Sequence, residues 1–92
     1  MPEPIQTVDQ AETRTSEYLL GKFPGEYDNK RTRFTRVLFD KENNVWRVKA
    51  ELALIRKKAL ILPLHVRHSL QVEIDPENRN LKYYEEGPPQ KF

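Results

Sequence analysis

The sequence predicts an α+β domain in which one N-terminal helix packs on a four-stranded antiparallel β-meander. The first observation behind this prediction is a regular alternation of apolar and polar residues over 46–74. A period of two is typical of strands with one buried side and one solvent-facing side. The second observation is that the links between the predicted strands are short, as they are between neighbouring antiparallel strands. The apolar side of such a sheet must be covered, and the helix is the element that can cover it.

The helix is predicted over residues 9–22. Asp9 is the expected N-cap, and Glu12 three residues later would complete a capping box. Pro24 ends the helix, because proline has no N–H group to continue the hydrogen-bond ladder. One face of this helix is expected to pack on the sheet, because its larger residues recur at three- and four-residue spacing. The residues of this stripe are Ala11, Thr15, Tyr18, Leu19 and Phe23.

The four strands are predicted over residues 31–40, 45–55, 60–74 and 81–85. In the first strand both faces mix polar and apolar residues. A β-bulge, which shifts the alternation by one residue, would reconcile this pattern, and the alternative is a strand covered on both sides near its C-terminal end. The third strand is expected to be an edge or to bend at Pro63, which cannot donate to a ladder. A turn at 56–58 joins the second and third strands.

This order of elements resembles the cystatin-like and related folds, in which a helix precedes an antiparallel meander. The resemblance is one of topology over most of the chain, so it implies a fold and no particular function. Within this frame we expect a flexible N-terminus over 1–8 with little to bury, a single domain over 9–86 and a flexible tail over 87–92.

Composition excludes several classes of function. The chain has 92 residues, of which 37% are hydrophobic and 33% charged, and this length suits one small domain. The absence of cysteine excludes disulfides, thiolate nucleophiles and cysteine-ligated metals. No apolar run approaches the roughly 20 residues of a membrane helix, and the first residues do not resemble a signal peptide. We therefore expect a cytoplasmic protein.

Catalytic and cofactor motifs are not apparent. Three glycines are too few for a phosphate-binding loop of the usual kind. His65 and His68 lie three residues apart on one strand, so they point to opposite faces and could not share a metal ion without a bulge. Ser69 and His68 also face opposite ways, which is the wrong geometry for a nucleophile and its base. Glu51 and Glu73 fit cross-strand ion pairs better than catalysis.

We therefore predict no catalytic, metal-binding or cofactor-binding residues. His68 falls on the apolar side of the alternation, where a core histidine bonded to a neighbour is expected. The alternative, a small hydrolase or isomerase, would require a pocket that joins His68 to a carboxylate.

The basic residues suggest a binding surface instead. Residues 30–68 hold eleven basic and three acidic side chains, between two acidic ends. The predicted pairing gathers part of this block on the polar side of the sheet, beside an apolar patch that includes Ala53. Either the C-terminal tail or the loop after the helix could cover that patch instead, and the charges could simply be solvated. The candidate contact residues are Arg47, Lys49, Ile55, Lys57, Lys58, Ile61, His65 and Arg67.

These features lead to a functional hypothesis: a non-enzymatic accessory protein that docks on a larger protein or complex through the polar side of its sheet. The alternative is weak nucleic-acid binding through the basic block 30–67. Such binding would be sequence-independent, because the outer positions of the second and third strands hold no aromatic residue for base stacking. An open meander also leaves two edges at which a homodimer could form.

Overall fold

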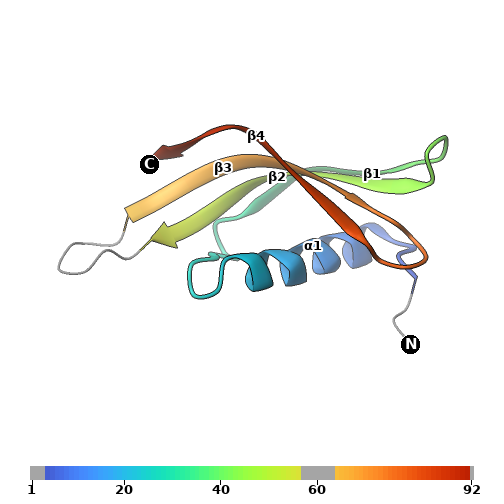
Figure 1. The fold of residues 1–92 in the computed structure, drawn as a ribbon, viewed down its shortest axis with the longest axis horizontal. Helices are drawn as coiled ribbons and strands as arrows, with labels where there is room; N and C mark the ends of the chain where they lie inside the picture. Colours follow the sequence, from blue (N-terminus) through green and yellow to red (C-terminus); the bar gives the residue numbers. More distant parts are fainter. Residues whose placement is uncertain (1–3, 57–63, 92) are drawn as a thin grey trace.

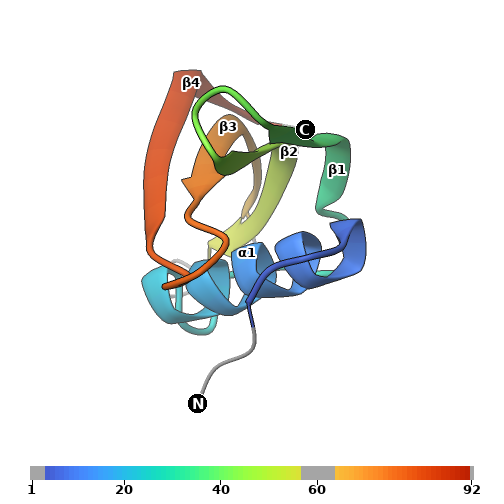
Figure 2. The ribbon, with the colours of Figure 1, turned by 90° about the vertical axis from the view of Figure 1, so that its right-hand side faces the viewer.

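The structure is a computed structural model that describes residues 4–56 and 64–91. Helix α1 (Val8–Lys22) precedes four strands, β1 (Arg33–Asp40), β2 (Val45–Arg56), β3 (Leu64–Ile74) and β4 (Leu81–Lys91). The strands form one antiparallel sheet in the order β1-β2-β3-β4. Helix α1 lies along one side of this sheet, so the molecule has two layers (Figures 1 and 2). The predicted fold class is therefore confirmed.

The helix begins earlier than predicted, and the cap is different. Thr7 is the N-cap: its hydroxyl oxygen accepts from the Gln10 N–H at 3.1 Å, and its own N–H donates to Gln10 Oε1 at 3.0 Å. The prediction of Asp9 and Glu12 as the capping pair was wrong, because Thr7 and Gln10 already form a complete capping box. The predicted stripe is confirmed, since Ala11, Thr15 and Leu19 are buried and Tyr18 and Phe23 partly buried.

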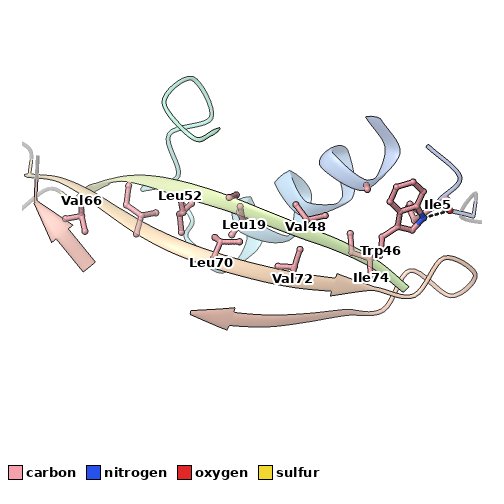
Figure 3. Packing of buried hydrophobic residues seen from close by; sticks show 12 residues of the cluster. Ile5, Leu19, Trp46, Val48, Leu52, Val66, Leu70, Val72 and Ile74 are labelled. Carbon is pink, nitrogen blue, oxygen red and sulfur yellow. Dashed lines mark hydrogen bonds between the residues drawn. The ribbon is translucent and has the colours of Figure 1, made fainter. Parts of the chain in front are cut away.

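The even-numbered residues of β2 and β3 form the side of the sheet that α1 covers, here called the covered face (Figure 3). Residues from the two strands lie directly opposite each other, as in the pairs Val48 with Val72 and Ala50 with Leu70. The apolar side chains here are nearly inaccessible to water, which makes this face the hydrophobic core. Its buried apolar members on β2 and β3 are Trp46, Val48, Ala50, Leu52, Leu54, Val66, Leu70, Val72 and Ile74.

A bulge in β1 explains the mixed pattern of that strand. Phe34 pairs with Ala50 and Arg36 with Lys49, so Thr35 is an additional residue between them. Both Phe34 and Val37 consequently pack against the core. The predicted bulge is confirmed, and it also reverses which side of the sheet the following residues face.

The last strand is longer than predicted. The sequence predicts an end at Glu85 and a tail from Gly87, whereas β4 continues to Lys91 and pairs Gln90 with Arg67. The prediction of this end was wrong, because residues 87–89 form a bulge opposite the single residue His68. Gly87 has a φ of 81°, a conformation that favours glycine. The prolines that follow have no N–H to donate, and a bulge tolerates this.

The N-terminal segment is also more closely attached than predicted. Ile5 is only 2% exposed, contrary to the expectation that residues 1–8 have little to bury. Its N–H donates to the Pro76 carbonyl oxygen at 2.7 Å, and its own carbonyl oxygen accepts from Trp46 Nε1 at 2.9 Å. A single apolar residue between Pro4 and Gln6 gives no periodic signal, so its burial could not be predicted. Pro63 and most of the predicted turn at 56–58 lie outside the described residues.

Candidate functional site

The side of the sheet opposite α1, here called the open face, carries the odd-numbered residues of β2 and β3. Arg47 lies opposite Glu73, and Lys49 lies opposite Gln71. Arg67 and His65 lie further along β3 on the same side. These four basic candidates therefore share one face, as the alternation predicts. Lys57, Lys58 and Ile61 lie outside the described residues.

Part of the positive charge on the open face is neutralised within the sheet. Arg47 lies between two carboxylates, with Nε 3.0 Å from Asp40 Oδ2 and Nη1 3.4 Å from Glu73 Oε2. Arg67 Nη1 lies 3.6 Å from Glu51 Oε2. Hydrogen bonds from Asn43 and Arg47 lower the pKa of Asp40 to about 2, so this carboxylate stays ionised at neutral pH. The predicted ion pairing of Glu51 and Glu73 is confirmed.

Two further cations on this face have no such partners among the described residues. Arg36 lies directly opposite Lys49, and in the described part of the chain neither has a carboxylate within 4.0 Å. Lys49 lies opposite Gln71, which in turn lies opposite Tyr84. These four residues cross all four strands in one line, here called the basic row. Tyr84, at its end, is 45% exposed.

The basic row borders a hollow in the open face. Arg36, Lys49 and Gln71 line this hollow of about 160 Å³ together with Leu38 and Arg47. Sequence reasoning missed Arg36 and Leu38, because the pattern does not say which side of the sheet β1 residues face after the bulge. The adjacent residues Tyr83 and Tyr84 of β4 face opposite sides of the sheet. Tyr83 is the inward one and packs on Tyr18, with ring centroids 5.9 Å apart.

The apolar end of the open face is partly covered by the segment between α1 and β1. The Ala53 N–H donates to Thr32 Oγ1 at 3.0 Å, and Ala53 is buried although it belongs to the outer set. Arg31 Nη1 lies 2.8 Å from His65 Nδ1, and Ile55, which lies opposite His65 on β2, is half-buried. Of the two covers considered from the sequence, the loop after the helix is therefore present over this end.

His68 is buried on the covered face, as predicted, with 5% of its surface exposed. The prediction that it bonds a neighbour was wrong, because neither ring nitrogen has a hydrogen-bond partner among the described residues. Burial lowers the pKa of this imidazole, opposed by the negative charge of Glu85, while the positive charge of Arg56 lowers it further. The residue opposite His68 on β2 is Leu52, and Leu70 is the next covered-face residue of β3, so these neighbours offer it no polar group.

Clusters of metal-ligating side chains and membrane-spanning helices are both absent from residues 4–56 and 64–91. Within these ranges no three His, Asp or Glu side chains are grouped so that they could hold a metal ion. No helix there has the length and apolar character needed to cross a membrane. No protein-family model, curated protein or solved structure matches this chain.

Proposed function

We propose that this chain is a non-enzymatic interaction protein that docks on a larger protein or complex through its open face. The observation that carries the proposal is the basic row. It places two cations side by side and continues across β3 and β4 with an amide, Gln71, and an exposed phenol, Tyr84. Arginine and tyrosine are residue types that protein interfaces favour.

The chemistry of the row indicates the kind of partner. Like charges directly opposite each other in a sheet lower stability, which is the situation of Arg36 and Lys49. A partner that supplies carboxylates would offset this cost, because each cation would gain a charge-assisted hydrogen bond. Leu38, which lines the same hollow as Arg36 and Lys49, offers an apolar contact there. The partner we propose is therefore an acidic protein surface.

The remaining candidate residues have a different role in this proposal. Arg47 and Arg67 already have carboxylates beside them, so they would set the orientation of a partner more than its affinity. Ile55 and His65 lie opposite each other at the margin of this face, where Arg31 contacts His65. Contacts by Lys57, Lys58 and Ile61 remain a prediction from the sequence.

Affinity purification from the native host tests the proposal. Tagged wild-type protein is compared with the double variant Arg36→Glu/Lys49→Glu and with Lys41→Glu, which changes an exposed residue of the β1–β2 turn. We expect a specific partner to be lost only with the double variant, while thermal unfolding shows that all three proteins fold. Recovery of the same proteins by all three baits would contradict the proposal.

A second candidate function is weak binding of single-stranded nucleic acid. It is favoured by Tyr84, which could stack on a base while Arg36 and Lys49 contact phosphates. It ranks second because Tyr84 is the one aromatic side chain of the basic row, whereas sheets that bind nucleic acid usually stack two or three bases on aromatic residues. Fluorescence anisotropy of a labelled oligonucleotide at about 50 mM salt tests it, with a log–log salt slope of about −0.7 expected for each neutralised phosphate. Absence of binding at that salt concentration would remove this candidate.

A further inference from the structure

A cavity of about 530 Å³ opens at the end of the molecule where the N-terminal segment, the β1–β2 turn and the β3–β4 turn meet. The three segments that form this end lie at the right of Figure 1, and the end cavity shares no lining residue with the hollow of the open face. Two aromatic rings form part of its wall: Phe39, which is 36% exposed, and Trp46, which packs in the core and keeps 8% of its surface exposed at this end. Their ring centroids lie 5.4 Å apart and the planes are tilted by 54°.

The aromatic wall is held in place by the N-terminal segment. Trp46 Nε1 donates to the carbonyl oxygen of Ile5, which is the dashed line in Figure 3. Ile5 is in turn bound to Pro76 in the β3–β4 turn. Because its only donor is already used, the indole offers a ligand its ring and no hydrogen bond. A wall fixed in this way loses little conformational entropy when a ligand binds.

The lining of the end cavity carries one negative charge and no positive charge. Glu77 lines it and has no ion-pair partner among the described residues. None of its lining residues is basic, although the chain holds 16 lysines and arginines. The faces of aromatic rings are also negative, because of their quadrupole, and attract cations within about 6 Å. Asn44, in the β1–β2 turn, adds a polar amide to the lining.

We propose that the end cavity binds a weakly hydrated organic cation, a guanidinium or methylated ammonium group, against Phe39 and Trp46 with Glu77 as its counter-ion. The apolar remainder of the lining, which includes Pro4 and Pro76, disfavours a strongly hydrated ion such as a simple ammonium. The site is separate from the basic row, so the proposal stands or falls independently of the open face.

Trp46 provides the measurement, because it is the single tryptophan of the chain. Its fluorescence is titrated with N-acetyl-arginine amide and with tetramethylammonium chloride, which separate the guanidinium and ammonium forms of the ligand. Neopentyl alcohol, an uncharged compound of similar shape, is the neutral probe, and sodium chloride is the control for ionic strength. We expect a saturable change in fluorescence with at least one cation. The neutral probe should bind at least about tenfold more weakly. The indole N–H resonance in NMR spectra gives a second readout.

Two variants test the assigned groups. Glu77→Gln and Phe39→Leu are each expected to weaken cation binding about threefold to tenfold. Glu42→Gln, which removes an exposed carboxylate from the neighbouring β1–β2 turn, is the matched control and should bind as the wild type does. If Phe39→Leu does not fold, Glu77→Gln alone decides. Equal binding of the neutral probe, or no saturable change in either fluorescence or NMR, would overturn the proposal.

Discussion

The covered face and the open face are built from the same strands, yet different interactions involve their residues: apolar burial on the covered face and charge pairing on the open face. On the covered face, Leu52 and Val72 are fully buried and contribute through the apolar area that they remove from water. On the open face, the alternation does not determine whether a charged residue has an ion-pair partner. Arg47 is held between two carboxylates, whereas Lys49, two residues away, lies opposite another cation. Alternation thus determines burial, while the cross-strand neighbour determines whether a charge is compensated.

The largest expected effect on stability comes from comparing one alanine substitution on each face of β2. Leu52→Ala should lower the free energy of unfolding by about 2–5 kcal/mol, because it leaves a cavity in the core. Lys49→Ala should change it by no more than about 0.5 kcal/mol, as is usual at the surface. Urea denaturation measures both. Losses of similar size would show that the open face is covered in solution.

His68 is the polar exception on the covered face, and its replacement gives the next largest effect. His68→Leu removes two ring nitrogens that have no partner among the described residues, at similar side-chain volume. A buried unsatisfied polar group costs about 1–3 kcal/mol, so the variant should be more stable by an amount in that range. Leu70→His, the reverse change at a neighbouring core position, should destabilise. Equal or lower stability of His68→Leu would mean that the imidazole has a partner in solution.

The two faces should also respond to acid in separate pH ranges. The pKa of His68 is lowered from its usual 6.5, so below pH 6.5 the unfolded chain takes up a proton that the folded protein does not, and stability falls. Asp40, with a pKa lowered from 3.8 to about 2, contributes stability that is lost as the pH falls through that interval. Denaturation curves at several pH values measure both losses.

Variants assign each loss of stability to its residue. The difference between wild type and His68→Leu isolates the upper range, and Asp40→Asn should remove only the lower one. An unchanged upper slope in His68→Leu would exclude His68 as its source. The charged groups that act on His68, Glu85 and Arg56, are present in both proteins, so they do not affect this comparison.

The sequence was sufficient to predict which residues of β2 and β3 lie on the covered face, but it did not predict the details of the open face. Burial in β2 and β3 follows from the period of two, and burial of the α1 stripe follows from helical spacing. Both patterns reflect only whether a side chain faces water or the core. The orientation of Arg36 depends on where the bulge places Thr35, and hydrophobicity does not encode that position. The continuation of β4 past Gly87 was missed for a similar reason, since Gly-Pro-Pro is locally typical of a strand end.

The end cavity was beyond sequence reasoning altogether. It depends on the N-terminal segment meeting the β3–β4 turn, and the contact between Ile5 and Pro76 is made by backbone groups that every sequence has. Only the aromatic pair Phe39 and Trp46 left a signal, since both lie on strands that were predicted. The burial of single side chains in the helix and strands could therefore be predicted, whereas a cavity formed by irregular segments that are distant in the chain could not.

The smallest predicted effect concerns two arginines on the open face. Arg47→Met should destabilise by about 0.2–1 kcal/mol, because it removes cross-strand pairs with Asp40 and Glu73. Arg36→Met should instead leave stability unchanged or raise it by a few tenths of a kcal/mol, because it relieves repulsion with Lys49. Both effects should shrink as salt is added, since mobile ions screen exposed charges. Measurement at low and high salt also separates charge from packing, because the methionine side chain keeps most of the apolar stem of arginine. If both variants lose stability equally at low salt, Lys49 and Arg36 are compensated in solution, and the case for an acidic partner on the basic row weakens with them.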